Sequence, residues 1–334
     1  MRKSILAAVA VAALSLTACG AVDTGTSSPS NNGGDGGEGT SAIPESCEGD
    51  GALLAVLLPN QTNPYYVAMK EGFEKAAKDN GMTAEVQIAG DDDAQQLAQA
   101  EAVLQKKPCA LALNPVKSEP AAAIVKSAND AGVPVFTVNV IVDQKALDAQ
   151  GGTVVQYLGA DNKAGGVQTA EQVLKDMGSD AELVIGFVTE PDEVPVVIRD
   201  EGFEEEIGKN PNAKVVARVD GNVKAPDSLN VTTEMLQGNP SLNVIFASTG
   251  PASQGALEAV KTSGRDVKVY GFCAPDIPLT SQYPGCVAQE PADYGKRVVE
   301  QIRKYVDGET VEKEILRPLK LYVDGETPAP GEVG

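Results

Sequence analysis

The sequence has no histidine and no tryptophan among its 334 residues, and its cations are outnumbered by its acids. Without imidazole, Ser-His-Asp and Cys-His nucleophile systems and zinc sites with histidine ligands are excluded. The chain has 27 Lys and Arg against 47 Asp and Glu, a formal net charge of −20. A nucleic-acid partner needs clustered cations and is therefore not expected. Hydrophobic residues make up 42% of the chain, which is typical of a packed globular protein.

The N-terminus has the pattern of an export signal. Arg2 and Lys3 precede an apolar stretch that is too short to span a membrane, so residues 1–18 are predicted to be a signal peptide. It ends in Leu-Thr-Ala-Cys, which resembles the bacterial lipobox and implies lipid attachment to Cys19. The alternative is an ordinary signal peptide that is followed by an unrelated cysteine.

Residues 19–46 have the composition of a flexible tether, because Gly and Ser dominate and almost nothing is available to bury. Residues 34–39 match the spacing G-x-G-x-x-G. No strand is predicted before this segment and no helix after it, so a dinucleotide site is not expected. We predict no cofactor and no metal site.

From residue 52 onward, apolar runs alternate with helical patterns. The first series has strands at 52–58, 83–89, 109–113 and 133–138, with helices after Asn63, at 94–107 behind Asp93, and at 119–132. The second series has helices at 162–177, 196–208, 227–237, 252–263 and 293–306, with strands at 182–188, 214–219, 243–248, 267–272 and 286–289. This alternation predicts parallel sheets with helices on both faces. The fold class is therefore α/β, with two doubly wound lobes.

The tetrapeptide EGFE occurs at residues 71–74 and again at 201–204. Each copy falls in the helix after the first long strand of its series, which indicates two similar lobes. We expect Phe73 and Phe203 to face the core. In open parallel sheets, ligands bind beyond the carboxyl ends of the strands, so a site between the lobes is expected.

Several segments together resemble the ribose-type periplasmic binding proteins of sugar ABC importers. They are Asn63-Pro64-Tyr65-Tyr66, Asn114-Pro115, AGVPVFTVN, LGADNKAGG, VYGF and AQEPADYG. The resemblance covers residues 52 to 323 and implies two Rossmann-like lobes joined by a three-strand hinge, the type I periplasmic binding protein fold. It places the first lobe at 47–160 plus 290–318, the second at 161–289 plus 319–325, and a tail at 326–334.

The resemblance also implies the ligand-binding residues. Tyr65 and Tyr66 match the aromatic pair that flanks the sugar, although a tyrosine at a helix start also packs locally. The polar residues that match or replace ligand contacts of the family are Asn63, Asn114, Asn139, Thr249, Cys273 and Gln289. Glu190 in the second lobe is a candidate hydrogen-bond acceptor for the ligand, and Asp192 and Glu193 lie next to it. The alternative is that this acidic loop only faces solvent.

The sequence departs from the family where charged side chains usually clamp sugar hydroxyls. Asn139 and Val140 replace an Asp-Arg pair, and Val197, Thr249 and Cys273 stand where Arg, Asn and Asp are usual. We therefore expect a cleft with few charged groups and a ligand with fewer hydroxyls, or more apolar surface, than ribose.

Four cysteines besides Cys19 allow three disulfide pairings in an exported protein. Cys47 and Cys109 sit at the amino ends of strands that are neighbours in the sheet order 2-1-3. Cys273 and Cys286 both fall in the second lobe. We favour the pairs 47–109 and 273–286, with a free Cys273 thiol in the cleft as the alternative. A metal site built from all four thiolates is not expected, because two lie in each lobe.

The predicted function is an extracytoplasmic solute-binding lipoprotein, anchored to the outer face of the cytoplasmic membrane. It would capture a small sugar or sugar-like molecule as a monomer and deliver it to an ABC transporter permease. A ligand sensor for a membrane receptor shares this binding chemistry and is the alternative. An enzyme on the same lobes is disfavoured because no catalytic residues are recognised.

Overall fold

A computed structural model describes residues 43–49 and 51–334. The predicted signal peptide, Cys19 and most of the predicted tether lie outside these residues. The tether was expected to reach residue 46, but a short 3-10 helix, η1 (Glu45–Cys47), already begins at Glu45. No helix in the part of the chain that the structure describes is long and apolar enough to cross a membrane.

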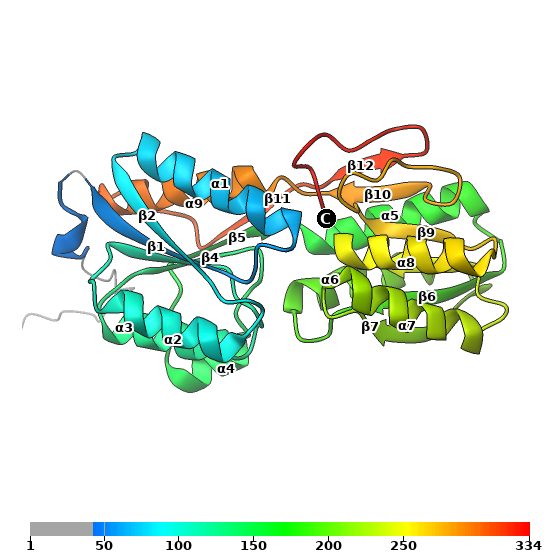
Figure 1. Cartoon of the computed structure of the whole chain (residues 1–334), viewed down its shortest axis with the longest axis horizontal. Helices are drawn as coiled ribbons and strands as arrows, with labels where there is room; N and C mark the ends of the chain where they lie inside the picture. Colours follow the sequence, from blue (N-terminus) through cyan, green and yellow to red (C-terminus); the bar gives the residue numbers. More distant parts are fainter. Residues whose placement is uncertain (1–42, 50) are drawn as a thin grey trace, which may run out of the picture. The chain divides into compact units, whose positions relative to one another are not determined.

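The first lobe is a parallel sheet with helices on both faces (Figure 1). Its strands are β1 (Ala52–Leu58), β2 (Met82–Ile88), β3 (Ala110–Leu113), β4 (Val135–Val138), β5 (Gln156–Ala160) and β11 (Glu314–Arg317). Its helices are α1 (Pro64–Asp79), α2 (Asp93–Leu104), α3 (Ala121–Asp130), α4 (Gln144–Gln150) and α9 (Pro291–Val306). The strand order is β11-β5-β4-β3-β1-β2, which confirms the expected 2-1-3 arrangement of the first three strands.

The second lobe repeats this plan with strand order β12-β10-β9-β8-β6-β7. Its strands are β6 (Leu183–Thr189), β7 (Ala213–Asp220), β8 (Val244–Ala247), β9 (Lys268–Phe272), β10 (Gly285–Ala288) and β12 (Lys320–Val323). Its helices are α5 (Asn162–Met177), α6 (Val194–Ile207), α7 (Ala225–Gly238) and α8 (Gly250–Ser263). The last strand, β12, is antiparallel to β10, whereas the other paired strands are parallel.

The chain passes between the two sheets three times, after β5, after β10 and after β11. These crossings form the expected three-strand hinge, and the two lobes make the expected fold. Beyond β12 the chain returns to the hinge, where Val333 pairs with Gln289 in an isolated antiparallel bridge.

Besides η1, three elements were not predicted from the sequence: α4, β5 and β11. Helix α4 has only seven residues, and β11 is a four-residue strand at the sheet edge whose burial alternates. Neither has the continuous apolar run that marks short buried strands such as β3, so the sequence gives little indication of them. The cap of α2 was also expected one residue late, because Asp92 rather than Asp93 accepts the hydrogen bond from the backbone N–H of Gln95.

Each lobe contains one disulfide. Cys47 pairs with Cys109, with 4.6 Å between the Cα atoms, and Cys273 pairs with Cys286, with 4.9 Å between them. The alternative of a free Cys273 thiol in the cleft is therefore wrong. The first disulfide joins η1 to the start of β3, and the second joins the end of β9 to β10.

The repeated EGFE segment is explained by helix packing. A Cβ atom at Gly72 would lie 2.2 Å from the carbonyl oxygen of Ala292 in α9, and one at Gly202 would lie 2.4 Å from that of Lys163 in α5. Each glycine therefore lets two helices approach closely, α1 with α9 and α6 with α5 (Figure 1). Phe73 and Phe203 are fully buried beside them, which confirms their expected place in the core.

Candidate functional site

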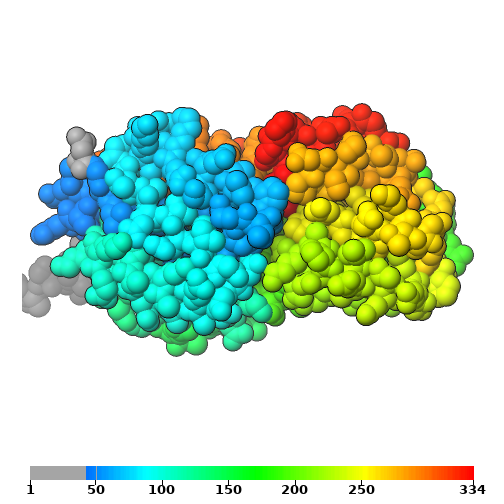
Figure 2. Space-filling model, viewed as in Figure 1, coloured from blue at the N-terminus to red at the C-terminus, as the bar shows by residue number. Residues whose placement is uncertain are grey.

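The two lobes meet at the loops beyond the carboxyl ends of their parallel strands. The backbone N–H of Ser118 donates to the carbonyl oxygen of Asp192 at 3.2 Å, and the N–H of Val194 donates to Ser118 Oγ at 3.0 Å. The Lys117 and Asp192 side chains form an ion pair across the same junction. In Figure 2 the blue and cyan first lobe touches the yellow second lobe on the face shown, and the red C-terminal segment borders the first lobe.

A small cavity lies at this junction. Its volume is about 20 Å³, which is room for about one water molecule. Side chains from both lobes surround it, so a molecule inside would contact both. The lining residues are Asn63, Tyr65, Tyr66, Asn139, Glu193, Arg199, Val223, Thr249, Gln289 and Gly334. Six of the nine predicted ligand-binding residues are among them.

The start of α1 places the two tyrosines. Asn63 caps this helix, because its Oδ1 accepts the backbone N–H of Tyr65 at 3.0 Å, and Pro64 occupies the first helical position. The rings of Tyr65 and Tyr66 meet edge to face with centroids 5.4 Å apart, and both are almost fully buried. They form an aromatic surface that suits apolar C–H groups.

The Tyr65 hydroxyl joins both sides of the cavity. Its Oη lies 2.9 Å from Asn139 Oδ1 and 3.1 Å from Gln289 Oε1. A hydroxyl donates one proton, so it satisfies only one of these two acceptors at a time. The other acceptor is available to a hydroxyl group of a bound molecule.

Asn139 reaches the cavity through an unusual backbone conformation. Its φ is 61°, in the left-handed region that Asn tolerates better than most residues. The Tyr157 hydroxyl donates to the carbonyl oxygen of Asn139 at 2.9 Å and holds this turn in place. The next residue, Val140, is fully buried and belongs to the core.

Arg199 on α6 is the main ligand-site candidate that the sequence analysis did not find. Its side chain is buried in the lining, where Nε donates to Asn162 Oδ1 and Nη1 donates to the carbonyl oxygen of Ser248, both at 2.8 Å. The guanidinium carbon lies 3.9 Å from the centroid of the Phe272 ring. Within the described chain, Nη2 has no hydrogen-bond partner. The expectation of a cleft with few charged groups is therefore wrong at this position.

Two buried glutamates accompany this arginine. Burial raises the pKa of Glu193 to about 8, and the nearby Glu190 adds to the shift while Arg199 opposes it. Burial also raises the pKa of Glu190 to about 7, and the Asp192 N–H that donates to its Oε1 opposes this. Near neutral pH, Glu193 is thus a candidate donor as well as an acceptor.

The lining also includes Thr249 at the start of α8, Gln289 after β10 and Gly334 beyond β12. Thr249 caps α8, and its Oγ1 accepts the N–H of Ala252 at 3.2 Å. The backbone of Gln289 pairs with Val333, so the segment predicted to be only a tail contributes to the lining.

Three predicted ligand-binding residues do not line the cavity. Asn114 is fully buried, and its Nδ2 faces Met69 Sδ at 3.4 Å. One carboxylate oxygen of Glu190 accepts a hydrogen bond from the backbone N–H of Asp192. The nearby Glu193 lines the cavity instead. Cys273 is held in its disulfide, so its sulfur has no proton to donate. Ligand contact by Asn114, Glu190 and Cys273 stays a prediction.

Three lining residues were not predicted, because the sequence around each gives little indication of ligand contact. Arg199 stands two residues before the second EGFE segment, in a helix whose sequence indicates packing and not ligand contact. Val223 has a left-handed backbone, with φ of 51°, that the sequence does not indicate. Gly334 reaches the cavity only because the chain turns back after β12.

Comparison with known proteins agrees with this geometry. Residues 54–310 match the protein-family model of the periplasmic binding protein domain. The chain belongs to the periplasmic binding protein family. It is 30% identical over 324 residues to the ribose import binding protein of Bacillus subtilis (strain 168), covering 95% of this chain and 98% of the relative.

Two other similar proteins are associated with different sugars. The chain is 27% identical over 271 residues to the D-apiose import binding protein of Actinobacillus succinogenes, covering 79% of this chain and 85% of the relative. An ABC transporter periplasmic solute binding protein from Actinobacillus succinogenes 130z, solved with bound D-allose, superposes with a TM-score of 0.73. It is 26% identical, and the match covers 82% of this chain and 97% of that one.

Proposed function

We propose that this protein captures one small sugar or sugar-like molecule between its lobes and delivers it to the permease of an ABC importer. The observation that carries the proposal is a single cavity lined by two aromatic rings from one lobe and by hydrogen-bonding groups from both. A sugar needs both, because its C–H faces pack on rings and each buried hydroxyl needs a polar partner. The relatives named for ribose and D-apiose import support this class of ligand.

Ligand capture depends on the opening and closing of the lobes. A cavity of about 20 Å³ is too small for any monosaccharide. The ligand therefore enters an open form of the protein and is then enclosed between the two lobes. Because it contacts both lobes only when they are closed, it shifts the population toward the closed form.

The lining residues have distinct roles in this proposal. Tyr65 and Tyr66 pack on the sugar, while Asn63, Asn139 and Gln289 hydrogen-bond its hydroxyls. Arg199 Nη2 donates to a ring or hydroxyl oxygen from the second lobe.

The proposed location of this monomeric protein is the outer face of the cytoplasmic membrane, where lipid on Cys19 anchors it. The lipobox and the Gly/Ser-rich segment after it support this. Replacement of Cys19 by Ser is expected to abolish incorporation of a palmitate analogue in cells. Absence of label in the wild type would contradict the anchor.

The test of binding is calorimetric titration with D-ribose, D-allose and D-apiose. We expect at least one to bind, and Gln289→Ala to weaken it by about 1–3 kcal/mol because a buried hydroxyl loses its partner. The matched control is Gln150→Ala, an exposed glutamine at the end of α4, which should leave affinity unchanged. If the wild type binds none of a panel of pentoses, hexoses, deoxysugars and polyols, the proposed function is wrong.

A further inference from the structure

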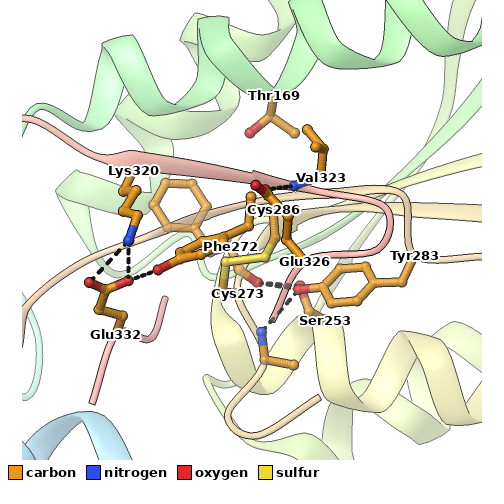
Figure 3. Close-up of a disulfide and its surroundings, with 12 residues drawn as sticks. Thr169, Ser253, Phe272, Cys273, Tyr283, Cys286, Lys320, Val323, Glu326 and Glu332 are labelled. Carbon is orange, nitrogen blue, oxygen red and sulfur yellow. Dashed lines mark hydrogen bonds and ion pairs between the residues drawn. A yellow bond between two sulfur atoms is a disulfide. The ribbon is translucent and has the colours of Figure 1, made fainter. Parts of the chain in front are cut away.

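The last four residues of the described chain, Gly331–Gly334, run back from β12 to the hinge; we call them the strap. Its start is anchored at Glu332, whose carboxylate accepts from the Tyr322 hydroxyl and pairs with Lys320 at 3.1 Å. Figure 3 shows Glu332 and Lys320 facing each other beside the Cys273–Cys286 disulfide. These contacts fix the strap to β12 of the second lobe.

The strap binds the hinge through its backbone. The N–H of Gln289 donates to the carbonyl oxygen of Val333 at 2.7 Å, and the N–H of Val333 donates back at 3.1 Å. The N–H of Gly334 donates to the carbonyl oxygen of Cys273 at 2.9 Å, and its own carbonyl oxygen accepts from the N–H of Gly250 at 3.0 Å. Polar backbone groups at the ends of β9 and β10 and at the start of α8 are thus satisfied by the strap and not by a ligand.

The fit of the strap is close. A Cβ atom at Gly334 would lie 2.4 Å from the backbone nitrogen of Cys273 and 2.5 Å from Cβ of Phe272. Val333 is 5% exposed and packs in the core cluster that contains Phe272 and Tyr65. Such packing makes the strap a fixed wall.

We propose that the strap forms one wall of the ligand cleft and limits the size of the sugar that this protein accepts. Gly334 lines the same cavity as Tyr65, Arg199 and Thr249. It occupies the space between the end of β9 and the start of α8, where the carboxyl ends of parallel strands otherwise face a ligand. The inference rests on the proposed function, because it concerns which sugars fit.

The test compares two sugars that differ by one group. D-Allose carries one more carbon and hydroxyl than D-ribose, so the ratio of their affinities reports the space available. Deletion of residues 331–334 is expected to raise the ratio of allose to ribose affinity by at least about tenfold, measured by calorimetry. Thr327→Ala, an exposed change before the strap, is the matched control and should leave the ratio unchanged.

A second variant and a ligand-free measurement keep the test decisive if the deletion does not fold. Val333→Ala preserves the backbone bridge but loosens the packing, so it should shift the ratio in the same direction by a smaller factor. Hydrogen exchange at the amides of Gly250 and Gln289 should speed up by at least about tenfold when the strap is loosened or removed.

The outcomes separate the two proposals. An unchanged affinity ratio in a folded strap variant, or unchanged exchange at both amides, would overturn the role of the strap. If the wild type binds no carbohydrate at all, the proposed function itself is contradicted, and the size filter with it.

Discussion

The helices that follow the first strand of each lobe, α1 and α6, make the same packing contact but carry different side chains. At an offset of 130 residues, Met69 corresponds to Arg199. A Cβ atom at Gly295 would lie 2.6 Å from the Met69 carbonyl oxygen, and one at Gly166 would lie 2.1 Å from that of Arg199. The backbone contact is thus preserved, while a fully buried thioether in one lobe is replaced by a buried guanidinium in the other.

The helix caps differ in the same way. Asn63 caps α1 through its side chain, and the equivalent Glu193 precedes α6 without a cap hydrogen bond. The first lobe therefore contributes rings and amides to the cavity, and the second contributes a cation and a carboxyl group. Each lobe can therefore supply different contacts to one ligand. The glycines keep the helix packing the same in both lobes, while the side chains at the cavity ends of α1 and α6 differ.

The largest effect is expected from exchanging the two side chains. Met69→Arg would bury a cation beside Asn114 without an ionic partner and should lower the free energy of unfolding by about 3–5 kcal/mol. Arg199→Met removes a buried cation but leaves Asn162 Oδ1 and the Ser248 carbonyl unpaired, so a smaller loss of about 1–3 kcal/mol is expected. Urea denaturation measures both, and equal losses would refute the difference between the lobes.

The two disulfides allow a second comparison. The first closes a sequence separation of 62 residues and the second one of 13. In the chain-entropy model, replacing Cys47 and Cys109 by Ala should cost about 4 kcal/mol, and replacing Cys273 and Cys286 about 3 kcal/mol. Thermal unfolding of the two double variants tests the order, and a larger loss for the second pair would reverse it.

Substitution of the packing glycines should show that the scaffold is shared. Gly72→Ala and Gly202→Ala each push a methyl group against a carbonyl oxygen of the neighbouring helix, and a loss of about 2 kcal/mol is expected for each. Gly238→Ala is the matched control, because a Cβ atom there meets nothing within 4 Å. It should be neutral or slightly stabilising. If only one of the two substitutions lowers the free energy of unfolding, the two helix contacts are not equivalent.

The smallest effect at constant pH is expected from a better helix cap in place of Glu193, whose titration also makes stability depend on pH. Its folded-state pKa of about 8 is raised above that of the unfolded chain, so the native state binds more protons between these values. Stability should fall as the pH rises from about 4.5 to about 8, and the fall is complete above that range. Glu193→Asn removes this titration and supplies a better cap, which should add about 0.5–1 kcal/mol. Thermal unfolding from pH 5 to 9 is the measurement, and an unchanged pH dependence would exclude Glu193 as its source.

Much of the fold could be predicted because it depends on local signals. The continuous apolar run of β1, the cap at Asn63 and the alternation of strands with helices are properties of neighbouring residues. The expected sheet order in turn brought Cys47 near Cys109. Short elements such as α4 and β11 were missed because they lack the continuous apolar run that marks equally short buried strands such as β3.

The site was only partly predictable, since its chemistry depends on contacts between distant segments. The sequence by itself determined the two-lobed α/β fold, the aromatic pair at the start of α1 and the burial of Phe73 and Phe203. Only the tertiary structure decided that Arg199 faces the cavity, because its position depends on Asn162, Ser248 and Phe272. The same holds for the strap, whose place depends on backbone groups at Gly250, Cys273 and Gln289. Backbone donors and acceptors are alike in every residue, so no sequence pattern indicates which of them will meet.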